Sequence, residues 1–465
     1  MKWRFLFHEA PSDFLLATEE VLTKSVGRGL APPTIRVNIF NPTAVLLGRH
    51  QIVEEEVNLE AIERYGLDLN RRCSGGGTII MDKDTPGWEV WIQEDLPGLP
   101  KDLEERFEYL SSPILKLFDI IGVKASFRPK NDIEVQGRKI SGTALYTDSG
   151  GLMFCGTVLL DFNIRRMLEV LKLAPEKISD KMISSFEERI TTVKREAGAV
   201  PNIEQLIKAF RRAFEETFHI KTEEGDLNDH ETELLENMIQ RYRNREWIYG
   251  KGPSKGVMQT YTKKTPGGLI RIHVKMTRGV IENVLITGDF FAYPPRLVYD
   301  LEASLKWVRA EPSEIKTAVI RTFKQVRGEI LGIIQRNKLL KPKKKKEKGV
   351  WGVLLVLLLL SPRAETMAKM ATTTINRYVV VLYMDIFSKV VESSETLLSN
   401  CVLSDWREDT SSSNSIISLL PCKSSVWHFK QPRGSNVCPV IAGTFSEKYS
   451  RSNTWQSIHA TLWIP

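Results

Sequence analysis

The stretch Arg71-Arg72-Cys73-Ser74-Gly75-Gly76-Gly77 opens directly into the apolar segment Thr78-Ile79-Ile80-Met81. Three consecutive glycines leave main-chain amides uncovered by side chains, so a phosphate or a flat ligand can lie against the backbone. The preceding arginines can add charge-assisted, bidentate contacts to phosphate. Because residues 67–72 are expected to form a strand that leads into the glycines, we expect this glycine run (Gly75–Gly77) to form one wall of a nucleotide pocket.

A second motif, Arg138-Lys139-Ile140-Ser141-Gly142, follows a turn expected at Gln136-Gly137. It lies in a meander of three expected strands, at 131–135, 139–146 and 152–161, with a further turn at 148–151. A lysine is a compact cation suited to a centre where an acyl oxygen meets a phosphate. We therefore expect both motifs to converge on one pocket for a nucleotide and an acid.

The remaining periodicity up to residue 245 predicts an α+β fold with a mixed or antiparallel sheet flanked by helices. Apolar residues alternate as in half-buried strands at 34–40, 44–48 and 88–93. They recur at helical spacing at 13–25, 101–120, 203–219 and 229–243. The glycines at 122 and 137 lack the spacing of a dinucleotide fingerprint, which argues against a doubly wound nucleotide-binding fold.

Changes in pattern divide the chain into four parts. Residues 1–245 are expected to be the catalytic domain, and 246–340 a small α+β domain with strands at 256–262, 269–276 and 279–287 and helices at 294–307 and 312–338. A lysine-rich linker occupies 341–348. Residues 349–465 show no sustained periodicity and receive no fold; one hypothesis is a read-through or frameshifted end that was never selected to fold.

Composition limits the cellular setting and the partners. The net charge of the 465 residues is +8, but much of the excess lies in the lysine-rich run, so nucleic acid is not an expected partner. Of five cysteines, only Cys73 and Cys155 lie before residue 341, which favours a reducing compartment over a disulfide framework. No secretory signal is evident, and the apolar run 350–360 is shorter than the roughly 20 residues that span a bilayer. We expect a cytoplasmic protein that is not in a membrane.

Together with Arg49-His50-Gln51, Asn131-Asp132-Ile133 and Gly156-Thr157-Val158-Leu159-Leu160, the two motifs resemble those of the lipoate–protein ligases. That superfamily also holds biotin ligases and octanoyl transferases. Trp247-Ile248-Tyr249-Gly250 and the unit that follows resemble the accessory domain of the activating ligases. The resemblance implies that lipoate (or octanoate) attacks ATP, with Mg²⁺, to give an acyl-adenylate and pyrophosphate. The acyl group then passes to a lysine of a lipoyl carrier domain of a 2-oxoacid dehydrogenase complex or of a glycine-cleavage H-type protein.

The resemblance also implies roles for individual residues. Lys139 would be the catalytic cation, and Asp132 would contact Mg²⁺ as well as ATP. The positions that would bind ATP are Arg72, Gly75, Gly76, Gly77, Thr78, Ile79, Ile80, Asn131 and Asp132. Those that would bind the acid are Arg49, Ser74, Lys139, Ser141, Gly142, Cys155 and Gly156. Family members often carry histidine where this chain has Met81 and Cys155.

Other interpretations of the same residues stay open. The glycine run alone could be a structural turn, Lys139 alone a solvated strand lysine, and Cys155 a small buried hydrophobe. If Cys155 were instead a nucleophile, the protein would be an ATP-independent octanoyl or lipoyl transferase and would lose activity in Cys155→Ala. A catalytically silent carrier-binding protein would keep its function in Lys139→Ala, whereas either enzyme would lose orders of magnitude.

Overall fold

The computed structural model describes residues 2–172, 180–250, 252, 258–331, 442–445 and 460–463. Its largest element is a mixed sheet in which β1 pairs in parallel with β2 and β11 and all other neighbours pair antiparallel. The strands in spatial order are β11 (Lys221–Glu224), β1 (Lys2–Ala10), β2 (Thr34–Phe40), β6 (Gly87–Gln93), β10 (Gly151–Thr157), β9 (Arg138–Asp148), β8 (Asp132–Val135) and β7 (Ser126–Arg128).

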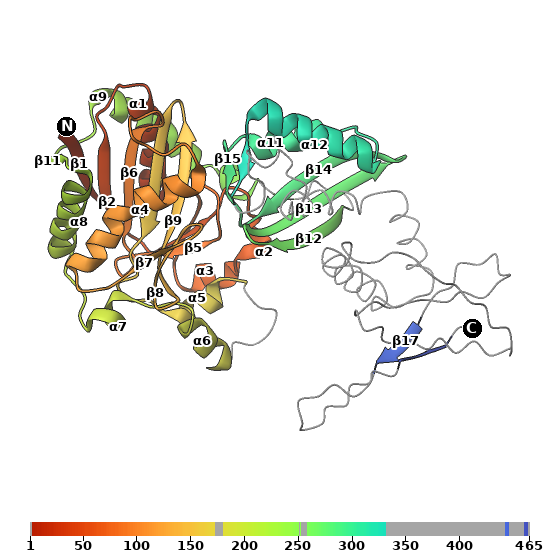
Figure 1. Cartoon of the computed structure of the whole chain (residues 1–465), viewed down its shortest axis with the longest axis horizontal. Coiled ribbons are helices and arrows are strands. Elements are labelled where there is room, and N and C mark those ends of the chain that lie inside the picture. The colour runs from red at the N-terminus through yellow and green to blue at the C-terminus, as the bar shows by residue number, and fades with distance from the viewer. Residues whose placement is uncertain are drawn as a thin grey trace, which may run out of the picture. The chain divides into compact units, whose positions relative to one another are not determined.

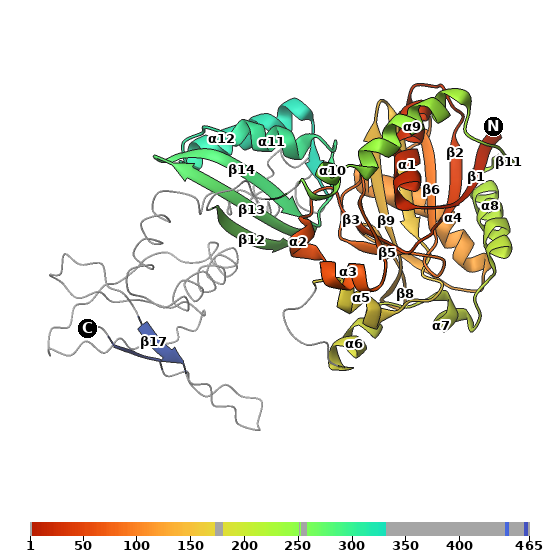
Figure 2. The ribbon, with the colours of Figure 1, turned by 180° about the vertical axis from the view of Figure 1, so that it is seen from behind.

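Helices cover both faces of this sheet (Figures 1 and 2). On one face, α4 (Leu103–Ile120) and α8 (Ile203–Phe218) share a core with Phe5, Val37 and Val90. On the other face, α1 (Ser12–Gly27) covers Leu6 and Trp91, and α9 (Asp229–Arg243) packs outside it. Because Phe5 and Leu6, like Val90 and Trp91, are consecutive, the alternation of a strand sends them to opposite cores. The α+β class expected from the sequence is confirmed.

A second, three-stranded sheet holds the glycine run. Its strands are β4 (Asp68–Arg71), β3 (Ala44–Leu47) and β5 (Ile79–Met81), with β3 in the middle. The chain must cross from β4 to β5 past β3, and Gly75–Gly77 lie in that crossing. The shorter helices of this part are α2 (Val53–Glu56), α3 (Leu59–Arg64), α5 (Ile164–Val170), α6 (Asp180–Glu187), α7 (Val193–Ala197) and α10 (Arg245–Tyr249).

The small second domain is also α+β, as expected. Its antiparallel sheet is β12 (Gln259–Thr265), β13 (Gly268–Thr277) and β14 (Val280–Gly288), and α11 (Leu297–Leu305) and α12 (Pro312–Val326) share its core. A two-stranded pair joins β15 (Ala292–Tyr293) to β16 (Glu329–Ile330). The helix expected over 312–338 ends at Val326 because Arg327 adopts a left-handed backbone conformation, φ 54°.

Three residues of the segment Trp247-Ile248-Tyr249-Gly250, which resembles the start of an accessory domain, belong to α10 (Arg245–Tyr249), and α10 packs on the catalytic domain. The side chain of Arg71 donates to the carbonyls of Ile248 (2.6 Å) and Trp247 (3.0 Å). The indole of Trp247 donates to the carbonyl of Arg71 (3.0 Å). The linker expected at 341–348 lies outside the described residues. So does the tail expected from 349, apart from β17 (Ala442–Phe445) and β18 (Ala460–Trp463), which pair antiparallel.

Candidate functional site

A cavity of about 450 Å³ joins the two motifs. Twelve of the residues expected at the site line it: Arg72, Gly76, Gly77, Thr78, Ile79, Ile80, Asn131, Asp132, Lys139, Gly142, Cys155 and Gly156. Met81 lines it as well. A larger hollow of about 700 Å³ around Asp82 and Arg166 contains neither Lys139 nor the glycine run. Since only the smaller cavity brings the motifs together, we take it as the candidate site.

Lys139 is held in place by both its backbone and its side chain. Its N–H donates to the carbonyl of Arg189 and its carbonyl accepts from Thr191, each at 2.8 Å, so the 189–191 segment fixes this part of β9. Its Nζ lies 2.7 Å from Asp132 Oδ1. A Cβ on Gly142 would stand 2.7 Å from the same Nζ. The lysine can therefore lie over residue 142 only because that residue is glycine.

The carboxylate of Asp132 is shared between two cations. Lys139 contacts one oxygen, and Arg128 contacts the other at 2.5 Å. Burial alone would raise the pKa of Asp132, but the charges and hydrogen bonds of Lys139 and Arg128 outweigh it and hold the pKa below its ordinary value. An ionised carboxylate beside a partly exposed ammonium can share a cation with the phosphates of a bound nucleotide.

The three glycines differ in what surrounds them. A Cβ on Gly75 would meet the carbonyl oxygen of Phe290 at 2.5 Å, and one on Gly76 would meet the ring of Phe291 at 2.7 Å. The N–H of Gly76, at φ 93°, donates to the carbonyl of Phe290 (3.1 Å). Only Gly77 is open, with the nearest atom, Asp289 Cβ, at 3.7 Å. The sequence predicted bare amides along the whole run, but the second domain covers its first two residues.

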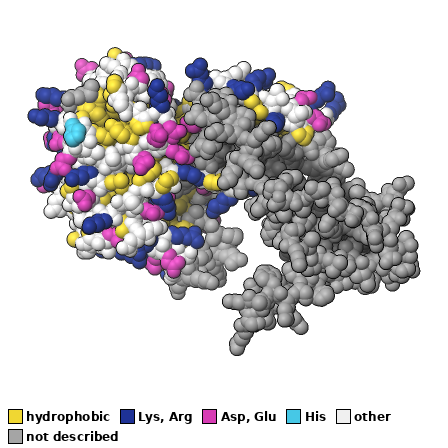
Figure 3. Space-filling model, in the orientation of Figure 1, with side chains coloured by type: hydrophobic (Ala, Val, Ile, Leu, Met, Phe, Trp, Pro, Cys, Tyr) yellow, Lys and Arg dark blue, Asp and Glu magenta, His cyan; other side chains and the backbone are white. Residues whose placement is uncertain are grey.

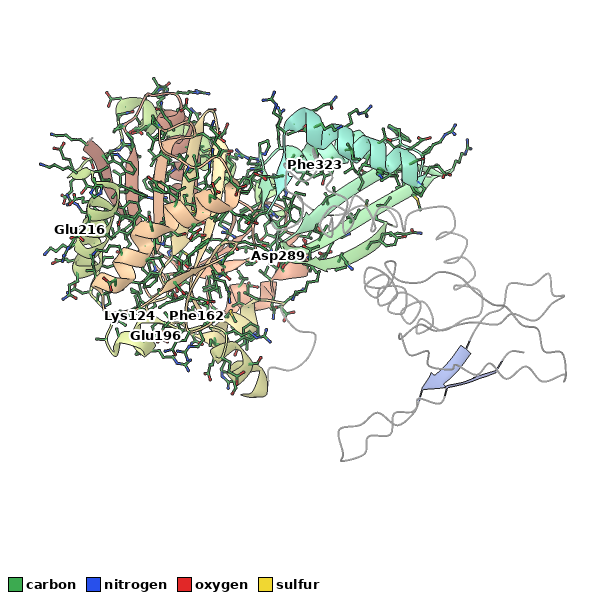
Figure 4. The ribbon with its side chains drawn as sticks, in the orientation of Figure 1. Lys124, Phe162, Glu196, Glu216, Asp289 and Phe323 are labelled. Carbon is green, nitrogen blue, oxygen red and sulfur yellow. The ribbon has the colours of Figure 1, made fainter. Side chains whose placement is uncertain are left out.

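The second domain thus forms part of the site. Gly267, Gly268, Asp289, Phe291 and Leu331 line the same cavity as Lys139, and Phe291 also joins the core under α4. Asp289 is labelled in Figure 4, as is Phe162, another residue of the cavity wall. His50 stacks on Phe290 with ring centroids 5.2 Å apart, and its carbonyl accepts from Gly288 (3.0 Å). Sequence motifs of the first domain could not have indicated these residues.

Four residues assigned to binding do not line the cavity. Arg49 instead lies over the rings of Trp247 (5.6 Å) and Tyr299 (5.5 Å), and its guanidinium donates to the carbonyl of Cys73 (3.4 Å). Ser74 and Ser141 are fully buried beside the cavity. Gly75 is covered as described above. The contacts of these four residues with substrates stay predictions.

Four polar residues line the cavity wall under α1: Glu19, Arg72, Glu89 and Cys155. Of these, the sequence missed Glu19 and Glu89. The Glu89 carboxylate accepts from Arg36 Nε (2.9 Å) and Nη2 (3.0 Å) and from Asn38. Burial and the charge of Glu89 raise the pKa of Glu19 to about 8. Burial also raises the pKa of the Cys155 thiol well above its ordinary value.

Neither a metal cluster nor a membrane span is found in the parts of the chain that the structure describes. No three His, Cys, Asp or Glu side chains there gather closely enough to hold a metal ion on their own. None of the helices there is both long and apolar enough to cross a bilayer. On the face shown in Figure 3, acidic and basic side chains are interspersed without a large patch of one sign.

A mixed sheet carries the lysine-bearing cavity, and a small second domain completes that cavity. The family model "lipoyl protein ligase A/B catalytic domain" matches residues 12–215, and the model "bacterial lipoate protein ligase C-terminus" matches residues 256–340. The chain belongs to this lipoate–protein ligase and octanoyltransferase family.

Relatives in the family carry two different activities in their names. The octanoyltransferase LipM of Geobacillus kaustophilus is 28% identical over 272 residues, covering 53% of this chain and 98% of the relative. Lipoate–protein ligase 1 of Staphylococcus aureus is 29% identical over 292 residues, covering 62% and 84%. The structure of P. falciparum LipL1 in complex with lipoate, 19% identical with a TM-score of 0.57, covers 72% of this chain and 97% of its own and shares the fold.

Proposed function

We propose that the protein is an ATP-dependent lipoate–protein ligase. It would activate lipoate as an acyl-adenylate, release pyrophosphate, and transfer the acyl group to a lysine of a lipoyl carrier domain. The single observation that carries the proposal is that Lys139, Asp132 and the open Gly77 share one cavity with a second domain of the ligase type. Cytoplasmic location and carriers from 2-oxoacid dehydrogenase or glycine-cleavage systems belong to the same proposal.

The residues around the cavity fit a nucleotide and a divalent cation. ATP would supply the phosphoryl centre that the acid attacks, and Mg²⁺ would neutralise part of the triphosphate charge. Asp132 is the carboxylate that would hold the cation, because Mg²⁺ in nucleotide sites commonly takes one or two protein carboxylates with phosphate and water as further ligands. Gly77 and Thr78 would lie against the nucleotide, with the apolar side chains of Ile79 and Ile80 beyond them.

Lys139 would act in both steps. Negative charge develops on an acyl or phosphoryl oxygen as each bond forms, and a fixed ammonium in a partly closed cavity stabilises that charge more than water does. The pairing with Asp132 and the backbone contacts to the 189–191 segment preorganise the ammonium. Little reorganisation is then needed when the reacting groups arrive.

The alternative function is that of an ATP-independent octanoyl or lipoyl transferase that uses Cys155. It is supported by relatives that are named octanoyltransferases. A thioester-forming cysteine attacks as the thiolate. The raised pKa of the Cys155 thiol keeps it protonated at neutral pH, which favours the ligase.

The test is pyrophosphate exchange into ATP with lipoate, octanoate and biotin, followed by transfer to a lipoyl domain. The ligase requires exchange that depends on lipoate or octanoate, is lost in Lys139→Ala and persists in Cys155→Ala. Carrier modification without ATP that disappears in Cys155→Ala would establish the transferase instead. A carrier-binding protein without catalysis would bind the lipoyl domain equally well in Lys139→Ala and modify it in neither form.

A further inference from the structure

A row of directly opposed residues crosses the sheet below α1. Arg36, Glu89, Cys155 and Ala144 face one another on β2, β6, β10 and β9. Glu89, Cys155 and Ala144 also line the cavity, together with Glu19 of α1 and Arg72. Side chains directly opposite on neighbouring strands lie within about 5 Å of each other. The wall of the cavity under α1 is therefore polar, whereas Ile80, Leu159 and Met167 line other parts of it.

One acceptor of this wall is already engaged, whereas Arg72 uses only part of its donors: its Nη2 donates to the Gly77 carbonyl. The Glu89 carboxylate is held by Arg36 and Asn38. Among the described residues, no partner meets the Nε–H of Arg72, whose residue is 8% exposed. In the same part of the chain Glu19, 5% exposed, has no ion-pair partner, and its carboxyl group accepts a hydrogen bond from the Cys73 thiol at 3.6 Å.

The protonation states add to the supply of donors. Burial and Glu89 push the pKa of Glu19 to about 8 against the opposing charges of Arg36 and Arg72. At neutral pH the Glu19 carboxyl therefore carries a proton and can donate an O–H. Cys155 remains a thiol, a weak donor, for the same reason of burial.

The polar wall lies at a suitable distance from the reacting centre. Lys139 Nζ lies over Gly142, two residues along β9 from Ala144, and Glu89 is two strands across from Ala144. With about 3.3 Å per residue and about 4.8 Å per strand, the separation is on the order of 12 Å. That is comparable with an extended medium-chain carboxylic acid whose carboxylate sits at Lys139.

We propose that Glu19 and Arg72, beside Cys155, form a donor subsite for the distal end of the acid. The acids that this chain activates would then include medium chains that end in a hydrogen-bond acceptor, such as a ketone or a hydroxyl. This inference rests on the proposed function and specifies its substrate class. A ketone or hydroxyl terminus can satisfy donors that a methyl terminus leaves without a partner, a difference of roughly 10- to 100-fold in affinity for each donor.

The experiment compares octanoate with 7-oxooctanoate, which has the same chain length, on the full chain. Acid-dependent pyrophosphate exchange gives kcat/KM, and calorimetry gives binding without turnover. We expect the wild type to prefer 7-oxooctanoate by about tenfold or more. Glu19→Leu should lose this preference and improve with octanoate, whereas Glu19→Gln should keep it because an amide also donates. Equal use of the two acids by the wild type, or an unchanged preference in Glu19→Leu, would overturn the subsite.

Two further measurements distinguish a failure of the subsite from a folding defect in a variant and from a failure of the proposed function. In the unaltered chain, ionisation of Glu19 should reduce the preference as the pH rises through about 8, and a constant preference across that range counts against the subsite. Absence of exchange with every acid would refute the adenylating function. In that case a calorimetric preference for 7-oxooctanoate that Glu19→Leu abolishes would still support the subsite, and its absence would refute it.

Discussion

Substituting the glycines of the run one at a time separates its two roles. In Gly75→Ala the new methyl group would stand 2.5 Å from the carbonyl oxygen of Phe290 and 3.2 Å from Phe291 Cα, both main-chain atoms of the second domain. Main chain cannot rotate away as a side chain can, so the segment 288–292 has to move. Gly77→Ala is the matched control, because its methyl group would meet nothing closer than 3.7 Å.

The magnitude follows from the contacts that such a movement breaks. Two main-chain hydrogen bonds join the segment to the catalytic domain, from Gly76 to Phe290 and from Gly288 to His50. Each contributes about 0.5–1.5 kcal/mol. Phe291 is 8% exposed, and re-exposing it fully costs about 1.5–3 kcal/mol. Complete release of the segment would therefore cost about 2.5–6 kcal/mol, whereas Gly77→Ala should change stability by less than about 1 kcal/mol.

The assay needs no ligand. Thermal unfolding of the nucleotide-free chain and hydrogen exchange of peptides that cover residues 288–293 should show a lowered midpoint and faster exchange in Gly75→Ala only. A pocket in which the glycines serve phosphate alone predicts a different result. If Gly75→Ala matched the wild type in both measurements and lost only nucleotide affinity, the packing argument would be wrong.

Three further predictions concern charged groups. Lys139→Met should lower kcat for pyrophosphate exchange by about 10²–10³, whereas Lys124→Met, at an exposed position labelled in Figure 4, should leave it unchanged. Glu89→Ala leaves Arg36 buried without its ion-pair partner and should destabilise the chain by about 3–5 kcal/mol in chemical denaturation. Because the pKa of Glu19 is raised to about 8 on folding, the folded chain retains a proton that the unfolded chain releases, so stability falls as the pH rises from about 4.5 to about 8. The free energy of unfolding of Glu19→Gln, relative to that of the wild type, should therefore rise across this window by at most about 1.4 kcal/mol per pH unit. Above about pH 8 the difference between the two should stay constant.

Local sequence signals predicted the elements whose stability is local. The helix expected over 203–219 occurs as α8, which begins with a capping box between Asn202 and Gln205. The strands of the meander occur as β8, β9 and β10; β8 alternates between buried and half-buried residues, whereas β9 and β10 each contain four consecutive buried residues because helices cover both faces of the sheet. By contrast, β11 was missed: it is four residues long, mostly exposed, and formed by parallel pairing with the distant strand β1. Such pairing has no local pattern in the sequence.

The residues of the candidate site also fall into those that local sequence signals predicted and those that only tertiary packing brings together. Both motifs were found from residue types and spacing, and the structure brings them to one cavity. Glu19 was not found because it sits in a helical stretch where an acidic residue looks solvent-facing; only the packing of α1 on the sheet places it near Glu89 and Arg72. The early end of α12 had a visible signal in Arg327-Gly328, because glycine is common just past the end of a helix. In the structure a Cβ at residue 328 would also meet Leu297 side-chain atoms at 2.7 Å.

The glycine run links the two domains to catalysis through one hydrogen-bond donor. The N–H of Gly76 points to the Phe290 carbonyl in this structure. An amide hydrogen donates well to one acceptor at a time, so a phosphate oxygen can use this N–H only after the carbonyl has left it. Residues 288–292 and a phosphate bound at Gly76 would therefore compete for this N–H, whereas Gly77 would stay available to the ligand. It follows that loosening the second domain by Gly75→Ala should weaken the fold while relieving this competition, so that stability and nucleotide affinity change in opposite directions.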